Sequence, residues 1–321
     1  MHSAPVTAGR RGVFVAEVLA NQPLGGDHFR MQLAVEGFAL ARPGQFIQLQ
    51  CRPLDHHRDR IVAEWPGDRP PRLSQSELLD REAFLRRPLS LAACRIGPDG
   101  RTELLLIYRV VGTGTRWLSG LASGEQLSVL GPLGNGFAIR DSAPAAALVG
   151  GGVGIPPLIF QAAALVAGGK QTIAFCGARR AEMLPLTLVP AAKVSATTEP
   201  TPCLAEFASQ GIPAVVATDD GSLGHHGLIS EAFAVWLEKS PFAPGRITVY
   251  ACGPEAMMRA VAELCIARKI ECQLAMERHM ACGMGTCQSC VVKVRSDDPR
   301  GWAFKLCCTD GPVFDAKEIV W

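Results

Sequence analysis

The sequence has no excess of charge of either sign, because 32 lysine and arginine residues nearly balance 30 aspartate and glutamate residues, giving a formal net charge of +2. Proteins that bind nucleic acid or anionic lipid usually carry a cluster of basic charge. The balance argues against both partners and favours small molecules or proteins. Behind the arginines of residues 1–13 there is no apolar run of signal-peptide length, so we expect a cytoplasmic protein.

Long uninterrupted hydrophobic runs are missing as well. Residues 142–169 carry no charge and are rich in alanine, valine and leucine, which resembles a membrane span at first sight. The glycines Gly150–Gly152 and the pair Pro156–Pro157 interrupt this stretch. A strand, a tight glycine turn and a helix account for the same residues, so we expect no transmembrane segment.

Cysteine, by contrast, is abundant, with 12 residues. We expect no disulfides, because the cytosol keeps thiols reduced. Five cysteines are concentrated between Cys282 and Cys308, whereas the other seven are scattered among apolar neighbours. The scattered ones are interpreted as small buried residues.

A chain of 321 residues suits two compact domains with an appendage. Over residues 10–141, short β-rich runs divided by glycine and proline predict an antiparallel β-barrel. The runs are Val13–Val18, Phe29–Val35, Phe46–Cys51, Leu89–Cys94 and Glu103–Val111. Residues 52–86 do not fit this pattern and are interpreted as an insertion, in which the spacing of Ser74 and Glu77 predicts a short helix through Phe84.

Over residues 142–274, expected strands alternate with expected helices. The strands are Ala146–Val149, Thr172–Phe175, Ala214–Ala217 and Ile247–Ala251, and the helices are Ile155–Ala167, Leu228–Glu238 and Glu255–Ala267. This order predicts a parallel, doubly wound sheet. Residues 275–321 remain as a small cysteine-rich segment, so the predicted fold class is α/β plus β.

A C-x4-C-x2-C pattern is formed by Cys282, Cys287 and Cys290. This spacing lets a loop wrap one side of a plant-type two-iron, two-sulfur (2Fe-2S) cluster, with the fourth thiolate coming from farther along the chain. Gly283 and Gly285 suit such a loop, which needs unusual dihedral angles and close approach of backbone N–H groups to sulfur. Zinc is the alternative, but zinc sites prefer paired C-x2-C knuckles and only one such pair occurs here.

The fourth ligand is a choice between two neighbours. Cys307 and Cys308 are adjacent, so their side chains leave the chain in different directions and only one can ligate well. Thr309–Pro312 form a turn directly after Cys308. The turn favours Cys308 and leaves Cys307 as the alternative.

Two sets of residues indicate nucleotide phosphates. In the predicted barrel, the Arg87 guanidinium can clamp a diphosphate, and Gly114 and Thr115 open a short helix whose amino end suits a phosphate. Each piece singly is also explained by a surface charge or an ordinary turn. In the predicted parallel sheet, a glycine-rich turn joins a buried strand to a helix through Gly150, Gly151, Gly152 and Gly154.

The glycine-rich turn alone is explained equally well as a tight connection without a ligand. Further segments lie at the carboxyl ends of other strands, namely Cys176, Gly177, Cys252, Gly253 and Pro254. Ligands of open parallel sheets bind at that edge, so the repetition favours a bound dinucleotide. Whether it is NAD or NADP stays open; Asp219 and Asp220 end a strand region and are candidates to face it.

The order of these motifs resembles the ferredoxin-reductase superfamily over nearly the whole chain. The ending, Met280–Cys290 with Leu306–Phe314, resembles the electron-transfer subunits of the two-subunit, NAD-dependent dihydroorotate dehydrogenases. The resemblance implies NAD as the dinucleotide and Cys308, which precedes T-D-G-P, as the fourth cluster ligand. It also implies that FAD is held by Arg87, Pro88, Leu89, Ser90, Ile107, Tyr108, Arg109, Gly114 and Thr115.

The reaction that this resemblance implies is electron transfer from dihydroorotate, oxidised in a separate FMN-type catalytic subunit, to NAD in pyrimidine biosynthesis. The assembly implied is a heterotetramer with two copies of each subunit. A nicotinamide exchanges two electrons as hydride whereas the cluster takes one, so FAD interconverts them and no protein general base is required. Two alternatives are a reductase serving ferredoxin, an oxygenase or a hydrogenase, and a non-catalytic iron-sulfur redox sensor.

Two departures from the family pattern bear on the partner. The insertion before Arg87 is extra, and the interval from Cys290 to Cys308 is long. Neither removes a flavin or iron motif.

Overall fold

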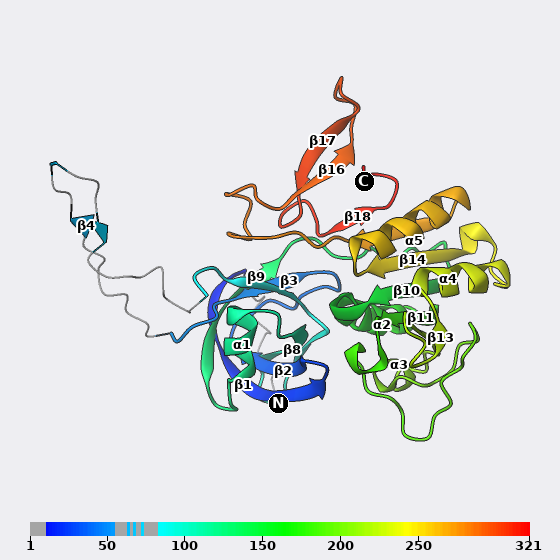
Figure 1. The fold of residues 1–321 in the computed structure, drawn as a ribbon, viewed down its shortest axis with the longest axis horizontal. Helices are drawn as coiled ribbons and strands as arrows, with labels where there is room; N and C mark the ends of the chain where they lie inside the picture. The colour runs from blue at the N-terminus through cyan, green and yellow to red at the C-terminus, as the bar shows by residue number, and fades with distance from the viewer. Residues whose placement is uncertain (1–10, 55–62, 65–66, 69–71, 74–82) are drawn as a thin grey trace, which may run out of the picture.

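The structure is a computed structural model. It describes residues 11–54, 63–64, 67–68, 72–73 and 83–321. Most of the expected insertion, including the helix predicted from Ser74, therefore lies outside the described residues. Figure 1 shows a curled antiparallel sheet, a parallel sheet flanked by helices, and a hairpin that rises beside them.

Seven strands form the first sheet, in the order β6-β3-β9-β1-β2-β8-β7, with antiparallel neighbours. They are β1 (Gly12–Gly25), β2 (His28–Val35), β3 (Phe46–Leu49), β6 (Arg87–Ser90), β7 (Ala93–Ile96), β8 (Thr102–Arg109) and β9 (Gln126–Leu133). Because β6 and β7 are edges, the predicted barrel is a curled, half-closed sheet. The short strands β4 (Ala63–Glu64) and β5 (Arg72–Leu73) pair only with each other.

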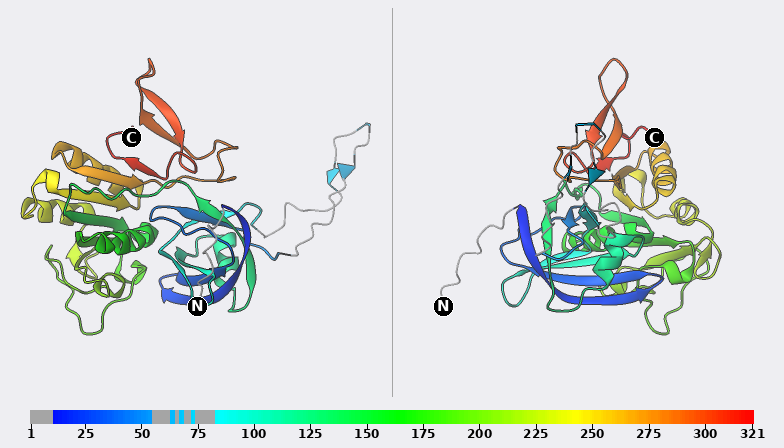
Figure 2. Two further views of the ribbon diagram at one scale, coloured as in Figure 1. Left: turned by 180° about the vertical axis from the view of Figure 1, so that it is seen from behind. Right: turned by 60° about the vertical axis from the view of Figure 1, so that its left-hand side comes forward.

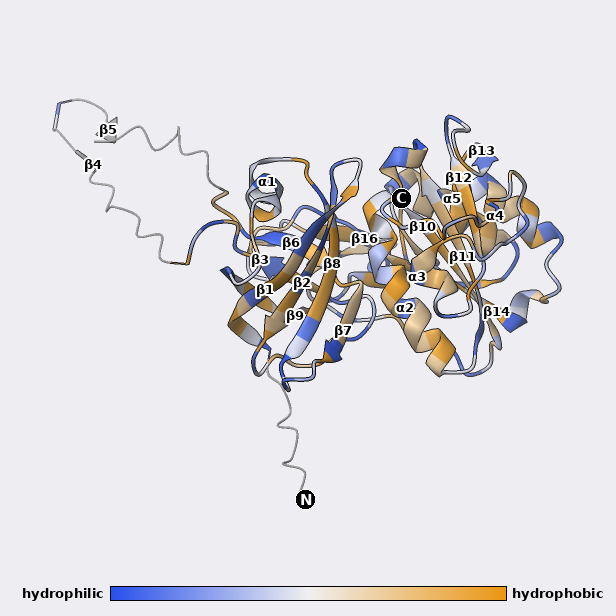
Figure 3. Cartoon of the chain, turned by 90° about the horizontal axis from the view of Figure 1, so that it is seen from below, coloured by the Kyte–Doolittle hydropathy of each residue, from blue (hydrophilic) through white to orange (hydrophobic). Residues whose placement is uncertain are grey.

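Side chains alternate along these strands, and one set fills the interior of the curl. On β8, Leu104, Leu106 and Tyr108 belong to this interior. The helix α1 (Thr113–Ser119) is fastened to β1 by Asn21, whose Nδ2 donates to the carbonyl of Leu118 at 2.8 Å. Hydrophobic residues run along the strands of both sheets in Figure 3, as this packing requires.

One expected strand is wrong in its extent. The run Leu89–Cys94 is divided between β6 and β7, with Leu91 and Ala92 between them. The reason is a change of partner, because β6 pairs with β3 whereas β7 pairs with β8. A continuous apolar run does not reveal such a switch.

The second sheet has the order β13-β12-β11-β10-β14-β15-β18 and is parallel except for β18. Its strands are β10 (Ala145–Gly151), β11 (Gln171–Ala178), β12 (Ala214–Thr218), β13 (His225–His226), β14 (Ile247–Cys252), β15 (Glu271–Ala275) and β18 (Val313–Asp315). Its helices are α2 (Pro156–Ala167), α3 (Ala205–Ala208), α4 (Ile229–Glu238) and α5 (Glu255–Ala267). Ala146 and Leu148 of β10 pack with α2 and α3, whereas Ala147 and Val149 pack with α4 and α5. Helices on both faces confirm the predicted doubly wound α/β fold.

The carboxyl-terminal segment joins this sheet. Its strands β16 (Val291–Arg295) and β17 (Trp302–Leu306) form a hairpin that stands out from both sheets in each view of Figure 2. Its last strand, β18, pairs antiparallel with β15, placing Phe314 beside Leu274. The cysteine-rich segment is therefore built onto the edge of the parallel sheet.

No helix among the residues that the structure describes is long and apolar enough to span a membrane. The uncharged stretch 142–169 contains β10, a short glycine turn and α2, as its glycines and prolines predict.

Candidate functional site

The cluster loop, defined as residues 282–290, lies directly before β16. Gly283 and Gly285 have φ angles of +70° and +90°, in the left-handed region that glycine tolerates. Folded in this way, the loop directs the backbone N–H groups of Met284 and Cys287 at the Cys282 sulfur, each at 3.4 Å. Such N–H groups stabilise a cluster thiolate, so the local geometry suits the predicted role of the glycines.

Cys307 and Cys308 have different surroundings although they are adjacent. The Cys307 thiol is fully buried and donates a hydrogen bond to the carbonyl of Met276 at 3.1 Å. The Cys308 thiol faces the cluster loop, where it interacts with the Cys290 thiol and the Gly285 N–H. Burial, and then the contact with Cys290, raises the pKa of Cys308 to about 12. The structure thus brings Cys308 to the loop and directs Cys307 away from it.

The four predicted ligands differ in their exposure to solvent. Cys290 and Cys308 are buried, Cys282 is half-buried and Cys287 is exposed. Hydrogen bonding, first with the Ser289 hydroxyl at 3.2 Å, lowers the pKa of Cys287 to about 6. At neutral pH this thiol is mostly thiolate, which is the form that binds metal.

Within the described part of the chain, no three His, Cys, Asp or Glu side chains are grouped as around a single metal ion. A 2Fe-2S cluster takes four thiolates, two on each iron. Cys282, Cys287, Cys290 and Cys308 supply that donor set by their chemistry, and the N–H groups directed at the Cys282 sulfur suit it.

Asn135 fastens the chain that follows Cys308 to the first sheet. Its Nδ2 donates to the carbonyls of Asp310 at 2.9 Å and Val313 at 2.8 Å, and its Oδ1 accepts from the Val313 N–H at 2.9 Å. The sequence gives no signal for this contact, because Asp310 and Val313 lie 175 and 178 residues beyond Asn135 in the chain.

The residues predicted to hold a flavin diphosphate are brought together. A Cβ atom added to Gly114 would lie 3.1 Å from both Cγ and Nε of Arg87, so glycine leaves room for this guanidinium at the start of α1. The Thr115 hydroxyl accepts hydrogen bonds from the N–H groups of Val111 at 2.9 Å and Gly112 at 3.2 Å. Among the residues that the structure describes, nothing lies within 4 Å of a Cβ built on Gly112. A cation beside open space and a helix start fits a diphosphate.

Strand β8 separates Ile107, Tyr108 and Arg109 onto two faces. Tyr108 is 1% exposed, its hydroxyl donates to Asn21 Oδ1 at 3.1 Å, and its ring stacks on Phe29. Ile107 belongs to the core shared with α2, and Arg109, two residues on, has a buried Nε without a hydrogen-bond partner. The structure therefore takes the Tyr108 side chain away from the other two, and only its backbone can join them. The alternation of a strand was a signal for this separation in the sequence.

Strand β6 alternates in the same way. Leu89 packs against the interior of the first sheet. Pro88 and Ser90 pair with Gln48 and Phe46 of β3, on the face that turns toward the carboxyl-terminal segment. The predicted flavin strand β6 therefore lies next to the predicted cluster site.

Arg86 was missed by the sequence interpretation. Its Nη2 donates to the Ser128 hydroxyl at 2.8 Å and its Nη1 to the Ser128 carbonyl at 3.1 Å. These bonds tie the start of β6 to β9 and hold Arg87 in place. The arginine pair 86–87 was the available signal, but it does not say which guanidinium binds protein.

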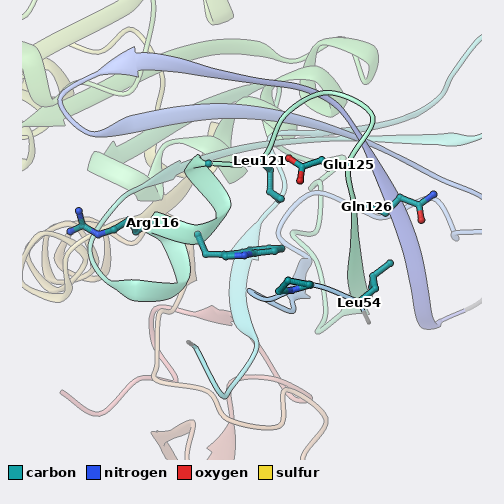
Figure 4. A pocket seen from close by; sticks show the side chains of 8 residues that line it. Leu54, Arg116, Leu121, Glu125 and Gln126 are labelled. Atoms are coloured by element: carbon teal, nitrogen blue, oxygen red, sulfur yellow. The ribbon is translucent and has the colours of Figure 1, made fainter. Parts of the chain in front are cut away.

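A pocket of about 500 Å³ lies beside the end of α1. Its lining includes Arg116, Trp117 and Leu121 from α1 and the turn after it, and Gln126 from β9 (Figure 4). None of its described lining residues belongs to the predicted flavin set. The sequence gave no signal for this pocket.

The predicted dinucleotide residues meet at the carboxyl edge of the parallel sheet. In the strand register, Gly150 lies beside Cys176 on one side and Cys252 on the other, and Gly151 lies beside Gly177. Strand β10 has β11 and β14 as its two neighbours, so chain order reverses here. Such a switch point is where open α/β sheets bind ligands.

Glycine lets the loops at this edge approach each other. A Cβ on Gly154 would lie 2.4 Å from the Cys252 carbonyl oxygen, and one on Gly151 would lie 2.9 Å from Cδ of Pro254. Gly152, with a φ of +53°, faces open space. The edge therefore presents backbone rather than side chains, which fits a diphosphate.

The two cysteines at this edge do not offer reactive thiols. Burial raises the pKa of both Cys176 and Cys252 far above the ordinary range. Gly253, with a φ of +155°, follows Cys252 in a conformation that only glycine adopts readily. These residues are placed to contribute backbone.

Asp219 and Asp220 follow β12 at the same edge and are exposed. The Asp220 carboxylate accepts hydrogen bonds from the Ser222 hydroxyl at 2.6 Å and N–H at 3.0 Å, which lower the pKa of Asp220. Asp220 thus holds its own turn, and the choice between NAD and NADP does not follow from it.

Comparisons with known proteins agree with this geometry. Residues 277–320 match the family described as the iron-sulfur cluster binding domain of dihydroorotate dehydrogenase B. The electron transfer subunit of dihydroorotate dehydrogenase B (NAD(+)) from Caldanaerobacter subterraneus subsp. tengcongensis is 30% identical over 306 residues, covering 95% of this chain and 98% of the relative. That from Enterococcus faecalis is 36% identical over 285 residues, or 88% of each chain.

Among solved structures, an NADH-dependent reduced ferredoxin-NADP oxidoreductase matches with a TM-score of 0.68 and 25% identity, covering 95% of this chain and 90% of that one. The Amycolatopsis cytochrome P450 reductase GcoB matches with a TM-score of 0.54 and 23% identity, covering 80% and 66%. The second likeness concerns the fold alone.

Proposed function

The chain belongs to the family of electron transfer subunits of NAD(+)-dependent dihydroorotate dehydrogenase B, and we propose that it carries electrons from a dihydroorotate-oxidising catalytic subunit to NAD. When bound, a 2Fe-2S cluster would supply one-electron transfer and FAD would convert single electrons into the two-electron hydride that reduces NAD to NADH. The protein's own contribution is to bind these groups close together and to exclude water between them.

The single observation that carries the proposal is the contact between the predicted cluster and flavin sites, in a segment built onto the parallel sheet. The cluster segment adds β18 to that sheet, and Asn135, which follows β9 of the first sheet, binds Asp310 and Val313. Gly283 of the cluster loop touches Gln48, which pairs with Pro88 of the predicted flavin strand. A chain of packed residues thus joins the sites that the proposed route requires.

Each group has proposed holders. We assign the cluster to Cys282, Cys287, Cys290 and Cys308, the FAD diphosphate to Arg87 and the start of α1, and NAD to the glycine edge of the parallel sheet. The division into an FAD-binding part (10–141), an NAD-binding part (142–274) and a cluster segment (275–321) belongs to the same proposal.

The partner is proposed to be an FMN-type catalytic subunit, in a cytoplasmic heterotetramer with two copies of each chain. The exposed Cys287 supports docking at the cluster loop, because an electron has to cross a short distance there. This chain offers no orotate site in the proposal; dihydroorotate is oxidised in the partner.

Anaerobic copurification with the candidate catalytic subunit tests the function. We expect about one FAD and about two irons per chain of this protein, and NAD reduction driven by dihydroorotate only when both subunits are present. A protein without flavin and iron, or NAD reduction that ignores the partner, would contradict the proposal.

A second function is favoured by the likeness to the ferredoxin-NADP oxidoreductase. In that case NADH would reduce ferredoxin through this chain without a catalytic subunit. The same preparation, assayed with ferredoxin in place of dihydroorotate, separates the two.

A further inference from the structure

Gln48 of β3 is a fully buried polar residue whose carboxamide is not hydrogen-bonded by any residue that the structure describes. It is 0% exposed, and neither its Nε2 nor its Oε1 has a partner among those residues. A buried carboxamide without partners is costly, because it has given up its hydrogen bonds to water. A partner supplied with the cofactors is a direct explanation for such a group.

Other buried glutamines show how this protein ordinarily treats the side chain. Gln45 donates to the Gly134 carbonyl at 2.7 Å and accepts from the Arg42 N–H at 2.9 Å. Gln273 donates to the Ala138 carbonyl at 2.7 Å and accepts from the Ala138 N–H at 2.8 Å. Both carboxamides use both of their polar atoms, whereas both polar atoms of Gln48 are left without a described partner beside the cluster loop.

The carboxamide of Gln48 lies against the cluster loop. A Cβ atom added to Gly283 would be 2.5 Å from its Cδ, 2.6 Å from its Nε2 and 2.8 Å from its Oε1. Gly283 directly follows Cys282, the first proposed ligand. The polar end of Gln48 is therefore packed on the loop that holds the thiolates.

The backbone of Gln48 is held in place by its neighbours in the first sheet. Its strand pairs with β6, where Gln48 stands opposite Pro88. Arg86 donates weakly to the Gln48 carbonyl at 3.4 Å and more closely to neighbouring Ser128. The side chain extends from the predicted flavin strand pair to the cluster loop.

We infer that Gln48 is a positioning residue that donates a hydrogen bond from its Nε2 to a sulfur of the cluster, and so sets the reduction potential of the cluster and its place beside the flavin strand. This inference rests on the proposed function. The other groups at the loop that can donate are the backbone N–H groups of Met284 and Cys287 and the Ser289 hydroxyl. Gln48 differs from them because it reaches the loop from the first sheet, and a single substitution removes it.

The sign of the effect follows from charge. Reduction adds a negative charge to the cluster, and a donor to sulfur stabilises the more negative state. Removing the donor therefore lowers the midpoint potential. We expect about a tenfold change in the ratio of reduced to oxidised cluster at a fixed potential, which is about 59 mV for one electron.

The test uses Gln48→Met, which keeps the length and bulk of the side chain but has no N–H donor. Gln161→Met is the matched control, because Gln161 of α2 is equally buried, at 1% exposed, and its side chain interacts with Tyr250 rather than with the cluster loop. Both variants are purified with the catalytic partner, their flavin and iron contents are measured, and potentials are obtained by redox titration with electron paramagnetic resonance. Exchangeable-proton coupling to the reduced cluster is measured after transfer to D2O.

We expect Gln48→Met alone to have a lower cluster potential and weaker exchangeable-proton coupling, with an unchanged flavin content. Folded Gln48→Met that fails to load the cluster, while Gln161→Met loads it, would also support the inference. A loaded Gln48→Met with unchanged potential and coupling, a shift of the flavin potential alone, or failure of Gln48→Met to fold would overturn it. If wild-type protein binds no cluster, the proposed function itself fails, which is a separate outcome.

Discussion

The cluster loop and the glycine edge of the parallel sheet bind their proposed ligands by opposite means. The cluster loop offers side chains, because four thiols are needed to hold iron. The glycine edge offers backbone, because a side chain at Gly151 or Gly154 would collide with Pro254 or Cys252. One region therefore fails when a side chain is removed, and the other fails when one is added.

The two regions also show that the type of a residue and its position in the fold carry different information about its role. A cysteine can be predicted as a ligand from its spacing, but its neighbour Cys307 has the same chemistry and a different place. A glycine has no side chain that could bind a ligand, so its role depends on which residues lie beside it.

The largest effect is expected at the adjacent cysteines. Cys308→Ala should remove almost all cluster iron, because the loop loses the thiol that faces Cys290. Cys307→Ala should keep the iron and cost about 1 kcal/mol of folding free energy, through its lost hydrogen bond to Met276. Iron content and visible absorption measure both. Loss of iron in Cys307→Ala with retention in Cys308→Ala would reassign the ligand.

The second largest effect is expected when a side chain is added at the glycine edge. Gly154→Ala places a methyl group against the backbone carbonyl of Cys252, and overpacking of this kind costs about 1–3 kcal/mol. NADH-driven flavin reduction should slow by about tenfold or more, because misplacement of the edge disturbs hydride transfer. Gly245→Ala has open space around it and is the control. Equal rates for the two variants would remove the edge from the dinucleotide site.

Arg87 tests the predicted flavin site, where a side chain, Arg87, and a glycine, Gly114, act together. Arg87→Leu removes a cation beside Gly114, and hydrogen bonds to charged groups contribute about 1.5–3 kcal/mol, so FAD affinity should fall by about 10- to 100-fold. Arg116→Leu, on the exposed side of α1, should leave it unchanged. Flavin fluorescence during dissociation measures both. A larger effect at Arg116 would move the diphosphate to the pocket of Figure 4.

The smallest effect is expected at Asn135, which connects two regions without binding a ligand. Asn135→Ala removes three hydrogen bonds to the turn after Cys308 and should cost about 1–2 kcal/mol. Hydrogen exchange should speed up in residues 306–314 and not in α4. Ser195→Ala, which removes local hydrogen bonds to Thr197 instead, serves as the control. Unchanged exchange in residues 306–314 would mean that β18 alone holds the segment.

Much of the fold was predictable because it repeats a simple pattern. The alternation of strands and helices gave the parallel sheet, and α5 begins and ends where its sequence pattern predicts. The break between β6 and β7 was not predictable, because it depends on which strand each half pairs with. The same is true of β18, whose three residues gain their place from β15.

The site divides in the same way. Cysteine spacing and glycine turns are local signals, and they identified residues that the structure brings together. Tyr108 was assigned with its neighbours although strand alternation turns its side chain into the core. Gln48, Arg86 and Asn135 act through contacts with residues distant in sequence, and no single-sequence pattern marks them.

The most direct test of the proposed electron route is anaerobic reduction of the purified chain by NADH, followed by its absorption and electron paramagnetic resonance spectra. We expect NADH alone to bleach the flavin and then to reduce the cluster, and we expect added catalytic subunit to let these electrons exchange with dihydroorotate and orotate. A chain that binds both groups but whose cluster stays oxidised while the flavin is reduced, with or without the partner, would contradict the proposed route.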